Sequence, residues 1–164
     1  MSYLVDGNNV MGQRVGWHRD KAGARRRLLG ELVRFARGER ARVAVVFDGA
    51  PDEHFPDGSD FMGVTVFYAE RGASADERIK QMVDAERERR TLVVVTSDKG
   101  LGDYVRRTGV RVVRAGEFRR RLDSMEEAQG AGGEGERPAL SHDELLAEMR
   151  YFGVAPEDDE GGSN

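Results

Sequence analysis

Apolar and polar residues follow two kinds of pattern over the first three quarters of the chain. Short, nearly continuous apolar runs rich in Val and Leu are typical of strands that are covered on both faces. These predicted strands are residues 3–5, 42–47, 64–68, 92–95 and 110–113. Longer runs carry apolar residues at helical spacing. These predicted helices cover approximately residues 20–37, 75–89, 99–107 and 116–127.

Predicted strands and helices mostly alternate, which favours an α/β sandwich around a mainly parallel sheet with right-handed crossovers. The connection between the second and third strands is the exception. Residues 49–61 show no helical pattern and contain Pro51, Pro56 and Gly58. We therefore expect this connection to depart from the simple strand–helix–strand arrangement.

The sequence predicts three regions along the chain. A folded domain covers residues 1–127, and a Gly-rich linker covers residues 128–140. An acidic tail follows over residues 141–164, with a short amphipathic helix that opens on the capping-box pattern from Ser141 to Glu144.

Composition places the chain among soluble proteins of the cytoplasm. It is 38% hydrophobic and 34% charged, and it contains no cysteine, which excludes disulfides and thiolate metal sites. No apolar run approaches the ~18 residues that a membrane span needs, and the N-terminal apolar run is too short for a signal peptide. We expect a cytoplasmic protein without a membrane partner.

The net charge of −4 conceals two oppositely charged parts. Residues 1–121 carry 24 Lys and Arg against 18 Asp and Glu, whereas residues 122–164 carry 2 against 12. A cationic body indicates a polyanionic partner. The acidic tail could lie over that basic surface and restrain access to it, which we state as a hypothesis.

Three of the predicted strands are followed by an aspartate: Asp6, Asp48 and Asp98. Ligands of open α/β sheets bind at the carboxyl ends of the strands, and neighbouring strands lie ~4.8 Å apart. Asp76 would join these residues from the start of a helix. Clustered carboxylates repel one another unless a divalent cation binds them. Oxygen ligands without cysteine or suitably spaced histidine favour Mg²⁺ or Mn²⁺ over Zn²⁺.

Each aspartate also has a purely structural interpretation. Asp6 and Asp48 each precede a glycine and could simply form turns. Asp98 could cap the helix that follows it, and the charge of Asp76 suits a helix N-terminus. Glu77 is assigned mainly to a capping box with Ser74. Three strand ends sharing one residue type are harder to explain as independent turns than any single case, but the spacing alone leaves the metal site and the structural interpretation equally open.

Four ordered segments resemble the NYN domain, specifically its YacP-like bacterial group, which belongs with the PIN-like nucleases. The resemblance covers approximately residues 3–123. The segments are Leu4-Val5-Asp6-Gly7-Asn8-Asn9-Val10, Val45-Val46-Phe47-Asp48-Gly49, Ser74-Ala75-Asp76-Glu77-Arg78-Ile79 and Val95-Thr96-Ser97-Asp98. The resemblance implies a three-layer α/β/α PIN-like sandwich around a mainly parallel five-stranded sheet, with strand order 3-2-1-4-5.

The resemblance also implies metal-dependent cleavage of RNA. Its acidic site corresponds to Asp6, Asp48, Asp76 and Asp98, with Asn9 as a polar partner. Asn8 stands where many relatives have tyrosine, so an aromatic contact is missing there. Second-tier candidates for the site are Glu77, Ser97, Thr96 and Asp103.

In such a site, one metal would lower the pKa of a bound water and a second would stabilise the leaving oxygen, giving a 5′-phosphate and a 3′-hydroxyl. RNA would be drawn in by basic residues near the crevice. These are Arg14, Arg71, Lys99, Arg106 and Arg107. The number of metal ions, the RNA substrate, endonucleolytic against exonucleolytic cleavage and the oligomeric state stay open at this point.

The strongest rival is a non-catalytic RNA- or ribosome-binding module that keeps the same fold, since a helix on a flexible tether suits an interaction protein. A haloacid-dehalogenase type of phosphohydrolase needs a second aspartate two residues after the first, where this chain has Asn8. A dinucleotide-binding fold is disfavoured because no Gly-x-Gly-x-x-Gly follows the first strand.

Overall fold

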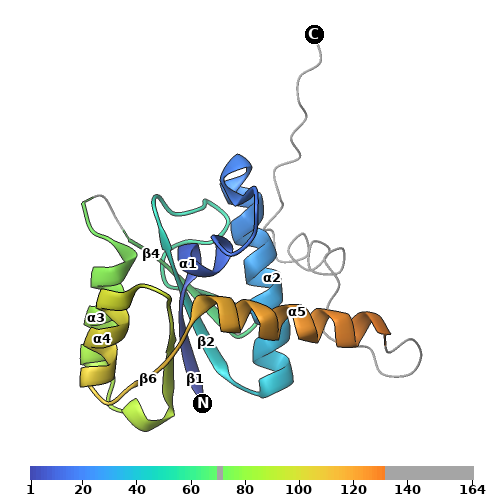
Figure 1. Cartoon of the computed structure of the whole chain (residues 1–164). Helices are drawn as coiled ribbons and strands as arrows, with labels where there is room; N and C mark the ends of the chain where they lie inside the picture. The colour runs from blue at the N-terminus through green and yellow to red at the C-terminus, as the bar shows by residue number, and fades with distance from the viewer. Residues whose placement is uncertain (70–71, 132–164) are drawn as a thin grey trace.

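The computed structural model describes residues 1–69 and 72–131, with side chains up to residue 128. The strands are β1 (Ser2–Asp6), β2 (Arg42–Asp48), β3 (Ser59–Phe61), β4 (Val64–Ala69), β5 (Leu92–Val95) and β6 (Arg111–Val113). The α-helices are α1 (Gly7–Met11), α2 (Lys21–Glu39), α3 (Ala75–Ala85), α4 (Lys99–Arg107) and α5 (Ala115–Ala131). Two short 3₁₀ turns, η1 (Trp17–Arg19) and η2 (Arg89–Thr91), complete this part of the chain (Figure 1).

The strands form one sheet in the order β3-β4-β2-β1-β5-β6. All neighbours are parallel except β3, which pairs antiparallel with β4. The five predicted strands therefore occupy the expected order, and β3 is an additional edge strand. It escaped prediction because it has only three residues, and the turn that joins it to β4 depends on positive φ angles at Met62 and Gly63.

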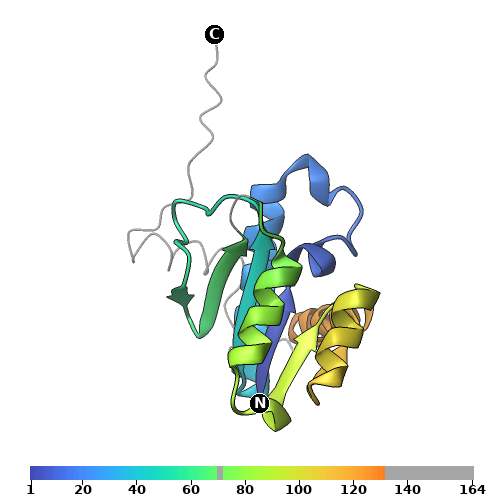
Figure 2. The same ribbon diagram turned by 90° about the vertical axis from the view of Figure 1, so that its left-hand side faces the viewer.

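Two helical layers cover the sheet, as expected for a three-layer sandwich. Tyr3 and Val5 of β1 pack in a core with residues of α2 and α5, whereas Leu4, between them, packs with residues of α3 and α4. This alternation follows from the period of two along a strand. Figures 1 and 2 show α3 and α4 on one side of the sheet and α2 and α5 on the other.

Helix α1 was not predicted, because the sequence after β1 was interpreted as a turn. Asp6 ends β1 and is also the N-cap residue of α1. Gly7 permits this abrupt change of direction, because a Cβ at this position would lie 2.5 Å from Phe47 Cδ1. The absent side chain therefore lets α1 pack directly against β2.

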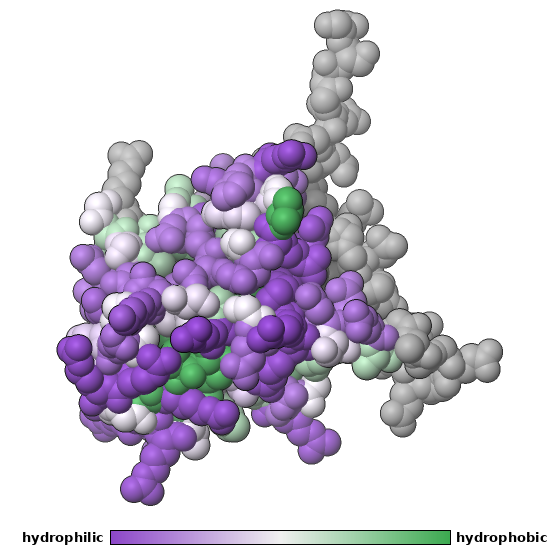
Figure 3. Space-filling view, in the orientation of Figure 1, coloured by the Kyte–Doolittle hydropathy of each residue, from purple (hydrophilic) through white to green (hydrophobic). Residues whose placement is uncertain are grey.

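The surface seen in Figure 3 is mostly hydrophilic, with a compact apolar patch around β6 between α4 and α5. No helix in the described ranges has both the length and the hydropathy that crossing a bilayer requires. Helix α5 continues to Ala131, four residues further than the sequence pattern predicted. The predicted tail helix at 141–152 and most of the predicted linker lie outside the described residues.

Candidate active site

The predicted aspartates stand at one edge of the sheet, where β1, β2 and β5 end. Asp6 is the last residue of β1 and Asp48 is the last residue of β2. Asp98 follows the end of β5 after two residues. Since β1 pairs in parallel with both β2 and β5, the chain brings these three residues to neighbouring positions.

Asp6 is the buried member of this set. Only 7% of its surface is exposed, and its Oδ2 accepts a hydrogen bond from Thr96 Oγ1 at 3.1 Å. Burial raises the pKa of Asp6 to about 6, the Thr96 hydrogen bond opposes this shift, and the charges of Asp48 and Asp98 add to it. These three carboxylates therefore act on one another electrostatically.

Two consecutive asparagines of α1 hold the neighbouring strand ends. Asn9 Oδ1 accepts a hydrogen bond from the Ser97 backbone N–H at 2.7 Å. Asn8 Oδ1 accepts one from the Asp48 backbone N–H at 3.0 Å. Sequence reasoning missed the positioning contact of Asn8, because in the sequence this residue stands out only by what it lacks, an aromatic ring or a second aspartate. The signal was its place beside Asn9 in the first turn after β1.

Asp48 and Asp98 each use one carboxylate oxygen structurally. Asp48 Oδ1 accepts from the Ala75 N–H at 2.9 Å, which fixes the start of α3 to the end of β2. Asp98 Oδ1 accepts from the Leu101 N–H at 2.8 Å and thereby caps α4. The other oxygen of each residue accepts no hydrogen bond from any residue that the structure describes. Both residues are exposed, so these oxygens are accessible to a ligand.

Asp76 makes contacts of its own at the start of α3, next to the Ala75 N–H that donates to Asp48. Its Oδ2 pairs with Lys80 Nζ at 3.2 Å, and its Oδ1 is shielded from solvent without a hydrogen-bond partner in the described part of the chain. The charges that raise the pKa of Asp6 are those of Asp48 and Asp98. The Glu77 N–H donates to Ser74 Oγ at 3.2 Å, so Ser74 caps α3 as predicted. Among the described residues, the Glu77 carboxylate does not accept the return hydrogen bond from Ser74 that a full capping box requires.

Arg78 fastens α3 to the carboxyl end of β4 and to the segment that precedes β3. Its guanidinium donates to Asp57 Oδ1 at 2.7 Å and to Asp57 Oδ2 at 3.0 Å, and also to the Tyr68 carbonyl oxygen. The Arg78 hydrogen bonds lower the pKa of Asp57. This forked pair fixes the position of α3, and with it the position of Asp76.

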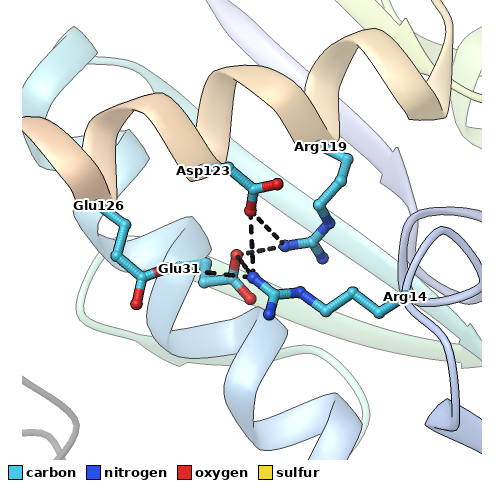
Figure 4. A network of polar contacts seen from close by, with 5 residues as sticks. All are labelled: Arg14, Glu31, Arg119, Asp123 and Glu126. Atoms are coloured by element: carbon cyan, nitrogen blue, oxygen red, sulfur yellow. Dashed lines mark hydrogen bonds and ion pairs between the residues drawn. The ribbon is translucent and has the colours of Figure 1, made fainter.

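The described residues contain one set of three carboxylates whose oxygens lie within 4.8 Å of one another, and it is not the predicted one. It consists of Glu31, Asp123 and Glu126 (Figure 4). The guanidiniums of Arg14 and Arg119 already occupy this cluster. Arg14 Nη2 lies 3.1 Å from Asp123 Oδ1 and 3.5 Å from Glu31 Oε2, and Arg119 donates to Glu31 Oε2.

A metal ion does not suit the cluster in Figure 4, because two cations already neutralise its carboxylates. Burial raises the pKa of Glu31, although Arg119 and Arg14 lower it. The contacts join α2 to α5, so this network has a structural role. Sequence reasoning did not find it, because its members are far apart along the chain.

The strand-end aspartates fit a hydrated divalent cation better than a tightly enclosed one. Mg²⁺ usually keeps several waters and uses only one or two carboxylates directly. Asp6, Asp48 and Asp98 supply hard oxygen donors and negative charge at neighbouring strand ends. They do not place three carboxylate oxygens within 4.8 Å of one another. The donor set therefore fits Mg²⁺ or Mn²⁺ bound in part through water.

The basic residues predicted to contact RNA occupy different environments. Arg14 points into the carboxylate cluster (Figure 4), and Arg71 lies outside the described residues. Lys99 and Arg106 line a cavity beside Asp98, and Arg107 is exposed on α4. Asp103 also lines this cavity and pairs with Arg106.

Comparison with known proteins places this arrangement in a family. A family model described as the YacP-like NYN domain matches residues 3–148. The crystal structure of Rae1 (YacP) from Bacillus subtilis is similar, with a TM-score of 0.65 and 25% identity over 78% of this chain and 76% of that chain. A crystal structure of a mutant of the same Bacillus subtilis protein gives a TM-score of 0.65 and 24% identity over 79% of each chain. No curated protein sequence matches the chain. The match over most of its length shows that the chain belongs to the YacP-like NYN domain family.

Proposed function

We propose that this protein is a metal-dependent ribonuclease that cleaves RNA endonucleolytically in the cytoplasm, as part of RNA decay or processing. The observation that carries the proposal is the position of Asp6, Asp48 and Asp98 at or just after the neighbouring carboxyl ends of three parallel strands. Membership of the NYN family, within the PIN-like nucleases, supports the same reaction class. The cationic character of residues 1–121 supports a polyanionic substrate.

Asp6, Asp48 and Asp98 would hold the cation, and Asp76, whose neighbour Ala75 donates to Asp48, would complete or orient this set. A bound Mg²⁺ or Mn²⁺ would supply a water of lowered pKa and stabilise charge on the leaving oxygen. Thr96 and Asn9 orient this edge through their hydrogen bonds to Asp6 and to the backbone of Ser97. Since the pKa of Asp6 is about 6 before a cation binds, Asp6 is partly protonated just below neutral pH.

A non-catalytic RNA- or ribosome-binding module is the second candidate. The observation that favours it is that the predicted aspartates do not converge within 4.8 Å in sets of three. Both candidates use the same surface, so only turnover separates them.

The test is incubation of single-stranded RNA with the full chain in Mg²⁺ or Mn²⁺, followed by analysis of the product ends. We expect cleavage by the wild type that leaves 5′-phosphates, and none by Asp6→Asn. Asp60→Asn is the matched control, because Asp60 is exposed on β3 at the far edge of the sheet. RNA that binds but stays intact with the wild type in both metals would establish the binding module instead.

A further inference from the structure

A cavity of about 270 Å³ lies directly beside Asp98, between α4, β6 and Arg114, the residue that precedes α5. Three basic side chains line it: Lys99, Arg106 and Arg114. We propose that this cavity is a subsite for one backbone phosphate of RNA, next to the bond that is cleaved. The proposal rests on the proposed function in taking RNA as the substrate, and it adds Arg114 to the residues that bind it.

The fold assembles the three cations from two separate segments. Lys99 is the first residue of α4, and Arg106 follows seven residues later, two helical turns along the same face. Arg114 comes from the connection between β6 and α5. Sequence reasoning missed Arg114, because only the pairing of β6 with β5 brings it near the start of α4.

Gly102 lines the cavity from α4, where it is buried. A Cβ at this position would lie 3.4 Å from Arg106 Nη1 and 3.8 Å from Val112 Cγ1, which is ordinary van der Waals contact. The Arg106 guanidinium therefore lies close over Gly102 at the cavity wall. Val112 closes the other side as an apolar surface.

The charges at this cavity favour an anion. Lys99 and Arg114 form no ion pair or side-chain hydrogen bond with any described residue. Arg106 Nη1 pairs with Asp103 Oδ1 at 3.4 Å, and both side chains are about half exposed. This pair orients the guanidinium and leaves its other N–H donors for a ligand. An exposed pair of this kind is weak, so it competes little with a phosphate.

The size and the position of the cavity indicate that the anion is a phosphate of an RNA strand. Pockets for whole small molecules usually have volumes of about 300–1,000 Å³, so this cavity suits a fragment such as a phosphate with its sugar. Arginine matches two phosphate oxygens at once through its planar fork. Asp98 and Thr96 belong both to the cavity wall and to the candidate active site. A phosphate bound here therefore belongs to the same RNA strand.

The first test measures binding of a short single-stranded RNA by fluorescence anisotropy in EDTA. We expect Arg106→Ala and Arg114→Ala each to weaken binding about tenfold, as the loss of one charge-assisted hydrogen bond does. Each should reduce the slope of log affinity against log salt by about 0.7. The matched control is Arg111→Ala, which removes an exposed arginine three residues before Arg114 and outside the cavity, and this variant should bind normally. Equal losses in all three variants would overturn the subsite.

A second test asks whether one phosphate is the ligand. A dinucleotide with a normal phosphodiester, or with an uncharged methylphosphonate, is titrated while the amide signals of Gly102 and Val112 are followed by NMR. We expect saturable shifts with the charged dinucleotide only, and none in the variant carrying both Arg106→Ala and Arg114→Ala. Shifts that persist in that variant, or that the uncharged dinucleotide also produces, would refute the proposal.

The two proposals fail in different ways. Normal cleavage and normal RNA affinity in the doubly substituted variant would remove the subsite and leave the ribonuclease intact. Phosphate-dependent shifts together with no cleavage by the wild type would keep the subsite and remove the ribonuclease.

Discussion

Thr96 donates its hydroxyl hydrogen to Asp6 Oδ2 at 3.1 Å and accepts the backbone N–H of Asp98 at the same distance. One buried hydroxyl thus connects the end of β1 to the start of α4. It makes the larger of the two hydrogen bonds that lower the pKa of Asp6 against the effect of burial, the other coming from the Asn9 backbone. The protonation of the candidate site therefore depends on a side chain that binds no metal itself.

Thr96→Val should raise the pKa of Asp6 above its value of about 6. Hydrogen bonds to charged groups contribute about 1.5–3 kcal/mol, which corresponds to an increase of about one to two pKa units. Carboxyl chemical shifts followed across a pH titration would measure the change. Thr96→Ser keeps the hydroxyl and should leave the pKa where it is; an equal shift in both variants would assign the effect to packing.

Asp6→Asn should stabilise the metal-free protein above neutral pH. Because the folded-state pKa of Asp6 is about 6 and its unfolded reference is 3.8, ionisation of this residue opposes folding. The penalty is absent below pH 3.8, grows as the pH rises toward 6 and then stays constant, on the order of 3 kcal/mol. Denaturant unfolding in EDTA at pH 8 and pH 4 would measure this difference, and equal effects at the two pH values would contradict it.

Mg²⁺ or Mn²⁺ should raise the Tm of the wild type, because a ligand that binds only the folded state stabilises it. The gain should be about 2.7 kcal/mol when the free metal is at 100 times its Kd. It should shrink below pH 6, where Asp6 takes up a proton. Thermal unfolding with and without EDTA measures it. Asp60→Asn should respond like the wild type, and a full response in Asp6→Asn would place the metal elsewhere.

Glu31→Leu should destabilise the fold by about 3–5 kcal/mol, because it leaves the Arg119 guanidinium buried without its principal partner. Combining it with Arg119→Met should recover much of that loss, since both charges then leave the interior together. Urea unfolding of the two single variants and the double variant measures the coupling. Strictly additive losses would show that Glu31 and Arg119 contribute independently.

The fold was predictable because its strands are continuous apolar runs and its helices have clear periodicity. The two elements that were not predicted, α1 and β3, are short and depend on backbone conformations that the hydrophobic pattern does not indicate. Helix α1 is five residues long and depends on Gly7 approaching Phe47, and β3 is three residues long. Segments of three or five residues are too short to show a helical or strand periodicity.

The sequence predicted which aspartates of the candidate site follow the ends of strands, but not the contacts of their side chains. The sequence placed Asp6, Asp48 and Asp98 at one edge of the sheet, but it could not assign individual oxygens to Ala75 or Leu101. The pair formed by Asp76 and Lys80 also depends on side-chain rotamers. Such contacts are set by tertiary packing, which local residue patterns do not determine.

Both outermost strands of the sheet, β3 and β6, are only three residues long. Each therefore presents very few consecutive unpaired backbone groups to another molecule. Long open edges invite intermolecular pairing and aggregation, and short ones discourage it. The two short edge strands therefore close the sheet on both sides. They limit self-association of the protein by addition of a strand from a second copy.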